Sequence, residues 1–473
     1  MARLGGLDAS LLSMEDDVTH LHLGSTAVFE GPVPPFADLR AMIVGKLPLV
    51  PRYRERIRRV PFDIARPVWA PDPHFNPDYH IRHTGLPSPG SPEQLLNLIG
   101  RVMANKLDLT KPLWEMWVVE GLQDDRWALI SKTHYALVDG ITDTALSSVL
   151  LDEHPEPSAP VPDTWRPEPE PSGARLLADA VADYVANPYE QLSAVRSLRH
   201  LPRGALRRVG GVARGVATVA GRTRPAPPSS LIGPIGPHRR YGWARASLDD
   251  VAAIRQGLGA AAGPVPGVTV NDVVLAAVAG GFRDLLTARG EPPEYRVVRS
   301  LVPMSVQADG TGGYSDRITA VVVELPVGGA DPVTRLAAIR EQTGGIARSR
   351  QAVAAEALTS LSGFAPPLLL AVGTRVATRT ASRMSAYSVH TVVTNAPGPR
   401  RPLYALGRRM IEAFPYAAIV APARVGVAVF SYQGQLSFGV TADFDAVPDI
   451  EVFCAGLEDA IAELLAAATA EAG

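Results

Sequence analysis

The chain has 473 residues, of which 46% are hydrophobic and 20% are charged, and this allows two domains with a buried core in each. The formal net charge of -2 gives no global indication of a nucleic-acid-binding protein. The single cysteine, Cys454, excludes an internal disulfide and a zinc cluster built on cysteines.

The first residues lack the basic stretch followed by an apolar core that a secretory signal requires. No charge-free run of about 18 apolar residues occurs in the chain, so no membrane-spanning helix is expected. These features predict a cytoplasmic protein.

Residues 1–150 mix strand-like and helix-like runs, distinguished by the period of their apolar residues. The predicted helices are 35–47 and 92–109, and the predicted strands are 25–31, 113–122 and 125–138. The last two strands are expected to pair through a turn at Gln123-Asp124.

From Glu153 the composition becomes Pro-rich and acidic, as in an extended linker. Helical composition returns at 175–221, and the following stretch is again rich in proline and glycine. The sequence therefore predicts an N-terminal half (1–150), a crossover segment (151–242) and a C-terminal half (243–473).

Within the crossover segment, 196–221 interleaves arginines with leucine and valine. This basic amphipathic pattern is typical of a helix that lies on a membrane surface. The alternative is a helix packed on the protein with its arginines in water.

The C-terminal half alternates helices and strands without strict βαβ repetition, which favours an α+β fold with mixed sheets. The predicted helices are 247–259 and 270–286, and the predicted strands are 296–306, 317–327 and 424–443. Residues 432–435 are expected to form a hairpin turn inside the last of these.

Residues 129–146 combine a strand-like run, a histidine and an Asp-Gly turn. In the strand His134 shares a face with Lys132, whereas Tyr135 falls on the other face. Asp139 is placed to cap a helix that begins at Gly140. A histidine at a strand end, facing a helix N-terminus, suits a general base that acts on an anionic transition state. The alternative is an ordinary strand-end histidine beside a helix cap.

This stretch resembles the HHxxxDG motif of the acyl-CoA-dependent acyltransferase superfamily that includes chloramphenicol acetyltransferase and peptide-synthetase condensation domains. Within it, the chain most closely resembles the bacterial wax ester synthase/diacylglycerol acyltransferase family. The segments that carry this resemblance follow one another in family order: 7–10, 111–122, 235–242, 270–281, 301–306, 394–407 and 431–443.

The resemblance implies two chloramphenicol-acetyltransferase-like halves of mixed α/β structure with a central tunnel between them. It implies an O-acyltransferase that moves a fatty acyl group from acyl-CoA to diacylglycerol or to a long-chain alcohol. It implies no metal and no redox cofactor, because acyl-CoA is itself the substrate. Because these acceptors are lipids, contact of 196–221 with the inner membrane face or with lipid droplets would serve that function.

The chain departs from the motif at its second histidine, the family's catalytic base, because that position is Tyr135 and only the first histidine, His134, is present. A tyrosine near pKa 10 is deprotonated about one time in a thousand at pH 7, roughly 4 kcal/mol from the competent form. Three outcomes stay open: His134 acts as the base through a local twist of the strand end, Tyr135 supports a slow reaction, or the protein binds acyl-CoA or lipid without turnover. A further alternative is an acyltransferase with a small soluble acceptor.

The resemblance also implies substrate-binding positions, each with a structural alternative. They are the Pro-Leu-Trp motif at Pro112, Leu113 and Trp114, the Asn-Asp motif at Asn271 and Asp272, and the turn residue Asn395. The alternatives are a core role for the tryptophan, helix capping by Asn271 or Asp272, and turn formation at Asn395.

Two glycines and one basic stretch are expected to act through the backbone or the surface. Gly434 and Gly439 suit a turn and a close approach of chains. His238-Arg239-Arg240 either meets the CoA phosphates or forms a solvated loop.

Overall fold

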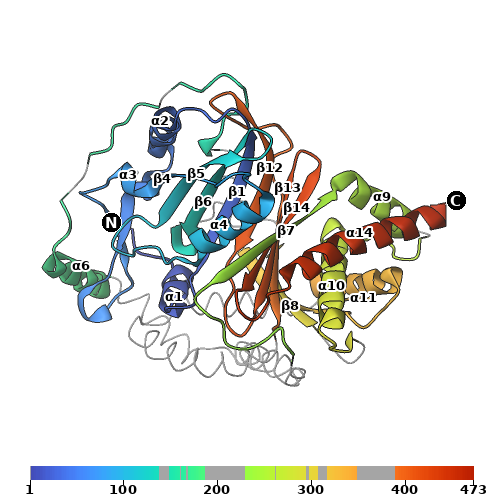
Figure 1. The fold of residues 1–473 in the computed structure, drawn as a ribbon. Coiled ribbons are helices and arrows are strands. Elements are labelled where there is room, and N and C mark those ends of the chain that lie inside the picture. Colours follow the sequence, from blue (N-terminus) through green and yellow to red (C-terminus); the bar gives the residue numbers. More distant parts are fainter. Residues whose placement is uncertain are drawn as a thin grey trace, which may run out of the picture.

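The computed structural model describes residues 2–137, 149–159, 161–166, 169–186, 229–260, 263–293, 298–306, 317–348 and 389–472. Two six-stranded mixed sheets lie beside each other, with the blue and cyan N-terminal elements on one side and the yellow-to-red C-terminal elements on the other (Figure 1). This arrangement confirms the predicted α+β class with mixed sheets. Within the described residues, no helix is both long and apolar enough to cross a membrane.

The first sheet has the strand order β11-β12-β1-β6-β5-β4. Its strands are β1 (His22–Glu30), β4 (Ile81–Gly85), β5 (Trp114–Leu122), β6 (Arg126–His134), β11 (Tyr404–Ala405) and β12 (Arg408–Ala417). Strands β4 and β5 are parallel, and the other neighbours are antiparallel. The predicted β5–β6 hairpin is confirmed, and Asp124 and Asp125 take the positive φ values that its turn requires.

The N-terminal helices and short elements surround this sheet. They are α1 (Gly6–Met14), α2 (Phe36–Lys46), α3 (Pro77–His80), α4 (Pro92–Ala104), α6 (Gly173–Ala186), the 3-10 turns η1 (Leu47–Leu49), η2 (Pro51–Arg54) and η3 (Pro61–Asp63), and the hairpin β2 (Glu55–Arg58) with β3 (Val68–Pro71). The predicted amphipathic helix α4 begins with a capping box between Ser91 and Gln94. Its apolar stripe, including Ile99 and Met103, packs on one face of the sheet against Ala128 and Ile130.

The second sheet has the strand order β7-β14-β13-β10-β8-β9. Its strands are β7 (Arg239–Ser247), β8 (Val298–Val306), β9 (Arg317–Leu325), β10 (Thr391–Ala396), β13 (Val425–Tyr432) and β14 (Gln435–Asp443). The helices α9 (Leu248–Gly259), α10 (Val270–Ala288), α11 (Pro332–Arg348) and α14 (Ile450–Ala472) share a core with it, on the right in Figure 1. The predicted hairpin turn is confirmed, because β13 and β14 pair through Gln433 and Gly434, both at positive φ.

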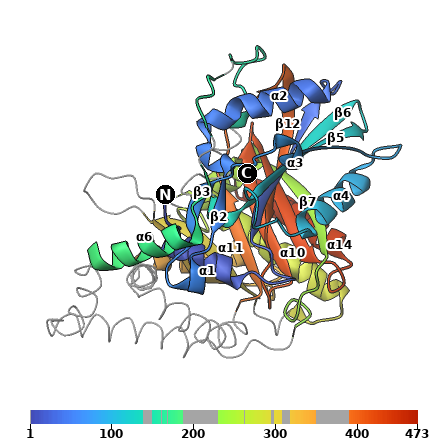
Figure 2. The same cartoon turned by 90° about the vertical axis from the view of Figure 1, so that its left-hand side faces the viewer.

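The two halves interlock rather than separate at one point of the chain. Strand β12 lies between β11 and β1 in the first sheet, although it follows β10 of the second sheet along the chain. It crosses β14 closely, because a Cβ added at Gly439 would lie 1.7 Å from the carbonyl oxygen of Pro415. On the other side α4 lies beside β7 in both views (Figures 1 and 2), where a Cβ at Gly100 would lie 2.6 Å from the Arg239 carbonyl oxygen. Both expected halves therefore contribute to a common interior.

The described part of the crossover segment is tied to the N-terminal half. Residues 153–159 and 161–166 form neither helix nor strand, as expected of an extended linker. Asp163 accepts two hydrogen bonds of 2.8 Å from Arg54, and Glu170 pairs with Arg56 and Arg58. The predicted helical run at 175–221 is α6 over its first part, and 196–221 lies outside the described residues.

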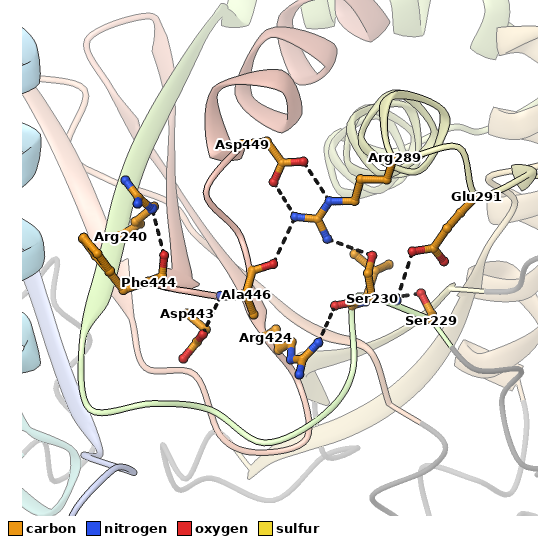
Figure 3. A network of polar contacts seen from close by, with 11 residues as sticks. Ser229, Ser230, Arg240, Arg289, Glu291, Arg424, Asp443, Phe444, Ala446 and Asp449 are labelled. Atoms are coloured by element: carbon orange, nitrogen blue, oxygen red, sulfur yellow. Dashed lines mark hydrogen bonds and ion pairs between the residues drawn. The ribbon is translucent and has the colours of Figure 1, made fainter.

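The chain returns to the described part at Ser229, where a polar network fixes it (Figure 3). Arg289, at the end of α10, pairs with Asp449 and donates a hydrogen bond of 2.8 Å to the Ser230 hydroxyl. Arg424 donates to the Ser230 carbonyl oxygen at 3.0 Å. The segment that leads into β7 is thereby held to the end of α10 and the start of α14.

Candidate active site

The motif strand β6 ends at His134, which lies opposite His22 of β1 in the antiparallel register. The His134 side chain is fully buried. Two residues earlier on the same face, the buried Lys132 ammonium donates to the carbonyl oxygens of Val102, at 3.0 Å, and Asn105 at the end of α4. Since α4 also lies beside β7, this end of β6 is close to the junction of the two halves.

Each nitrogen of the His134 imidazole has a polar neighbour, but only Nδ1 makes a well-formed hydrogen bond. Its Nδ1 accepts a hydrogen bond of 3.0 Å from the backbone N–H of Ala136, so the ring proton is assigned to Nε2. Nε2 lies 3.2 Å from Oε1 of Glu15, within ion-pair distance, although its direction falls outside that of a well-formed hydrogen bond. In this geometry His134 has no free lone pair with which to take a proton from an alcohol.

Glu15 lies just after α1, and its side chain is 2% exposed. Burial by itself raises the pKa of this carboxyl, but the contacts with His134 and with the backbone N–H of Leu21 hold the pKa below its usual value. Glu15 is therefore ionised at neutral pH and provides the negative charge beside the motif.

Tyr135 begins a 3-10 turn, η4 (Tyr135–Leu137), so the predicted strand 125–138 was wrong over 135–137. Its backbone N–H donates to the Leu21 carbonyl oxygen at 3.0 Å. The side chain is half-buried, and burial raises the pKa of Tyr135 to about 12. At pH 7 the phenolate fraction is then about one in 100,000, roughly 7 kcal/mol from the basic form. At neutral pH Tyr135 is therefore in its basic form even more rarely than its sequence alone indicated.

Two further histidines, His20 and His22, lie near His134, and the sequence analysis missed them. The His22 ring centroid lies 5.6 Å from that of His20 and 6.4 Å from that of His134. Burial lowers the pKa of both His20 and His22, so both rings are neutral at pH 7. The signal that could have found them is the Thr-His-Leu-His alternation where β1 begins. Among the residues that the structure describes, no group of three or more His, Cys, Asp or Glu side chains could hold a metal ion.

The predicted cap Asp139 and its neighbour Gly140 lie outside the described residues. Their predicted role at the start of a helix stays a prediction.

The Pro-Leu-Trp motif packs in the core of the N-terminal half. Pro112, Leu113 and Trp114 are all buried. The Trp114 indole N–H donates to the Tyr53 carbonyl oxygen at 2.8 Å, and its ring stacks on His80 at 4.6 Å between centroids. The backbone reaches the motif strand, because the Leu113 carbonyl oxygen accepts from the His134 N–H at 3.0 Å. These contacts agree with the structural alternative, and acyl contact by the motif stays a prediction.

The Asn-Asp motif lies in the first turn of α10, but the helix cap is Thr269. The Thr269 hydroxyl accepts from the Asp272 N–H, and the Asp272 carboxylate accepts from the Thr269 N–H at 2.8 Å. Asp272 also accepts a hydrogen bond of 2.7 Å from the Thr343 hydroxyl of α11 and is fully buried. The expected capping by Asn271 or Asp272 is corrected accordingly: Asp272 completes a capping box that Thr269 begins. Asn271 is half-buried, and a substrate contact there stays a prediction.

The remaining predicted positions fall in strands and turns. Asn395 still belongs to β10, where it lies beside Val429 of β13, so the expected turn begins after it. Gly434 has the positive φ of a turn and Gly439 makes the closest approach to β12, as expected. Arg239 is buried among backbone carbonyl oxygens. Arg240 lies 4.1 Å over the ring of Phe444 and donates to its carbonyl oxygen (Figure 3).

Two family models match the chain. The model described as "Wax ester synthase/diacylglycerol acyltransferase catalytic domain" matches residues 4–274, and that described as "WS/DGAT C-terminal domain" matches residues 315–465. Among curated proteins, "Probable diacyglycerol O-acyltransferase tgs1" of Mycobacterium tuberculosis is 34% identical over 98% of this chain and 96% of its own length. "Probable diacyglycerol O-acyltransferase tgs3" of the same organism is 40% identical over 54% of this chain and 96% of its own.

Solved structures share the fold. The wax ester synthase/diacylglycerol acyltransferase from Marinobacter aquaeolei VT8 matches with a TM-score of 0.69 at 23% identity, over 99% of this chain and 100% of that chain. TRI3 trichothecene 15-O-acetyltransferase from Fusarium sporotrichioides matches with a TM-score of 0.58 at 13% identity, over 98% and 94%. These identities support the shared fold alone.

Proposed function

Since the chain belongs to the wax ester synthase/diacylglycerol acyltransferase family, we propose that it transfers a fatty acyl group from acyl-CoA to the hydroxyl of diacylglycerol or of a long-chain alcohol. In this reaction the acceptor oxygen bonds to the acyl carbon, the thioester C–S bond breaks, and the acceptor proton ends on the CoA thiol. The observation that carries the proposal is the match to both family models in order along the chain, with the motif strand β6 at the junction of the two halves.

The chemistry of position 135 sets the expected rate. A neutral phenol can donate a hydrogen bond to the oxyanion that develops on the acyl carbonyl, and such donors stabilise the transition state by about 3 kcal/mol. It cannot take the acceptor proton efficiently, because burial raises the pKa of Tyr135 to about 12. Slow turnover is therefore expected, with Tyr135 as hydrogen-bond donor and the acceptor proton reaching the CoA thiolate through solvent.

The second candidate is an acyl-CoA-binding or lipid-binding protein without turnover. Two observations favour it: Tyr135 is protonated at neutral pH, and the Nδ1 lone pair of His134 is already used by Ala136. An acyltransferase with a small soluble acceptor is a third candidate, which only the choice of acceptor separates from the first.

The test measures CoA release from palmitoyl-CoA with dioleoylglycerol, hexadecanol or a small soluble alcohol as acceptor. We expect slow release by the wild type with the lipid acceptors and, for Tyr135→His, a rate at least about tenfold higher. Tyr135→Phe is expected to be slower than the wild type, since it loses the phenolic donor. His134→Ala is included because it removes the contacts of the imidazole with Ala136 and Glu15 at the end of the strand.

Each other outcome selects among the candidates. Palmitoyl-CoA that raises the unfolding temperature without any CoA release, in the wild type and in Tyr135→His, supports the binding protein. Release with the soluble alcohol alone supports the third candidate. Equal turnover in the wild type and all three variants would remove the motif from the mechanism.

No metal is needed for this chemistry, and turnover is expected to be unchanged after dialysis against EDTA. Loss of turnover that returns with a divalent cation would overturn this part of the proposal.

Peripheral contact with a lipid surface through 196–221 belongs to the same proposal, and its support is the basic amphipathic sequence. Flotation with anionic vesicles is expected for the wild type and is expected to weaken when the arginines of this stretch are replaced by glutamine.

A further inference from the structure

A short segment, residues 15–21, joins α1 to β1 and runs beside the end of the motif strand; we name it the 15–21 strap. The strap closes on itself, because Oε1 of Glu15 at its first residue accepts a hydrogen bond of 2.8 Å from the backbone N–H of Leu21 at its last. Asp16 holds the bend between them by accepting from the N–H groups of Val18 and Thr19. The carboxylate of Glu15 is therefore fixed in place by its own segment.

The strap holds His134, the last residue of β6, and Tyr135, the first residue of η4, through adjacent contacts. Oε1 of Glu15 lies 3.2 Å from Nε2 of His134, and the Leu21 carbonyl oxygen accepts the N–H of Tyr135 at 3.0 Å. Together with the peptide bond between His134 and Tyr135 and the Leu21 N–H bond to Glu15, these contacts form a closed ring that runs through the Glu15 carboxylate. The direction in which residue 135 leaves the strand is set inside this ring.

The strap also reaches the second half of the molecule. The guanidinium of Arg239, in β7, donates through Nη2 to the Val18 carbonyl oxygen and through Nη1 to the carbonyl oxygens of Gly236 and His238. The same segment thus contacts the motif and the first strand of the C-terminal half.

We propose that Glu15 is the positioning residue of the motif, whose carboxylate fixes the end of β6 and the placement of residue 135. The consequence for catalysis rests on the proposed function, but the positioning itself does not. The carboxylate suits this role because one oxygen accepts the Leu21 N–H and also lies 3.2 Å from the His134 ring. An apolar side chain would leave the Leu21 N–H without an acceptor and remove the negative charge beside the imidazole. An unpaired buried donor costs about 1–3 kcal/mol, enough to favour a different arrangement of the turn.

The first test measures hydrogen exchange in the full-length chain. Glu15→Leu is expected to lower the protection of the Tyr135 amide about tenfold or more, while amides in the middle of β5 and β6 keep theirs. Glu15→Gln keeps an oxygen acceptor of the same reach, so we expect partial rescue of that protection. Asp17→Asn is the matched control, since Asp17 is an exposed acid of the same strap, and it is expected to behave as the wild type.

The second test uses the Tyr135→His background, in which a histidine occupies the base position. There Glu15→Leu is expected to lower kcat about tenfold with little change in the KM for palmitoyl-CoA, and Glu15→Gln to lie between. A role in stability alone would instead lower protection throughout the sheet and the unfolding temperature of the whole chain.

The two tests fail independently. Unchanged protection of the Tyr135 amide in folded Glu15→Leu, or a loss spread evenly over β5 and β6, would overturn the positioning role. Absent turnover in the Tyr135→His background, with the expected local loss of protection, would count against the proposed function and leave the positioning role supported. If Glu15→Leu does not fold, Glu15→Gln decides, and protection at Tyr135 equal to that of Asp17→Asn counts against the proposal.

Discussion

Lys132 is a fully buried lysine whose ammonium group donates hydrogen bonds to backbone carbonyl oxygens at the end of α4. Burial lowers the pKa of Lys132 from 10.5 to about 8, and the nearby Glu115 carboxylate opposes that effect only in part. A lysine with a depressed pKa gives up its proton in the folded chain at a pH where the unfolded chain still holds it. The free energy of unfolding therefore rises with pH above about 8 through this group.

We predict that the free energy of unfolding of the wild type, relative to that of Lys132→Met, rises by about 1–1.5 kcal/mol between pH 7 and pH 9. The sign follows because the unfolded state binds more protons than the folded state in this interval. Urea denaturation of both proteins at each pH measures it. Parallel stabilities of the two proteins across the interval would show that the folded lysine titrates near its usual value.

At the level of single residues, the sequence predicted the motif strand up to His134, since a strand depends on local alternation. It could not predict that His134 lacks a free lone pair. Glu15 and His22, its neighbours in the fold, lie more than a hundred residues away in the sequence. No local sequence pattern indicates that they meet His134. The use of Nδ1 by Ala136 depends on the 3-10 turn, which the apolar run up to Val138 concealed.

At the level of elements, α10 shows how a motif that resembles a binding site also builds a helix. The Asp272 carboxylate accepts from the Thr269 N–H and hydroxyl and from the Thr343 hydroxyl, which ties the start of α10 to α11. The helix prediction held because the apolar period and the capping residues lie within a few positions of one another. The contact with Thr343 is distant in sequence and was not predicted.

We predict that Asp272→Ala lowers the free energy of unfolding by about 2–4 kcal/mol, because it removes half of the capping box and leaves buried donors without an acceptor. The matched control is Asp249→Ala, an exposed acid in the first turn of α9, for which a loss below about 0.5 kcal/mol is expected. Urea denaturation measures both. A small stability loss with a raised KM for palmitoyl-CoA would instead assign Asp272 to the substrate.

At the level of the whole molecule, the sequence predicted the mixed sheets, two hairpins and the helices α2, α4, α9 and α10, but not α11, α14 or how the halves interlock. Strand β12 belongs by sequence to the C-terminal half, yet it pairs with β1 of the first sheet over Leu23–Phe29. The alternation of apolar residues within a strand does not identify the strand that it pairs with. Pairing between strands so far apart in sequence therefore cannot be read from the sequence pattern. Only the glycine at 439, expected at a close approach, indicated where another chain segment would pass.

That crossing carries the last prediction. A Cβ at Gly439 would lie 1.7 Å from the Pro415 carbonyl oxygen and 2.5 Å from the Tyr241 hydroxyl, which itself donates to that oxygen at 2.6 Å. Gly439→Ala must therefore move β14 away from β12, and a loss of about 2 kcal/mol or more in the free energy of unfolding is expected. Since Pro415 lies beside Ser25 of β1, the shift would also reach the sheet that holds β6.

The control for this crossing is Gly45→Ala, because a Cβ at Gly45 in α2 meets nothing within 4 Å. At Gly45 the substitution replaces a helical glycine by alanine, which has the higher helix propensity. It is expected to raise the free energy of unfolding by about 0.5–1 kcal/mol. Urea denaturation of the two variants should thus give opposite signs. Equal stability of Gly439→Ala and the wild type would mean that the two sheets do not meet at Gly439 and Pro415, and the interlocked arrangement of the halves would have to be given up.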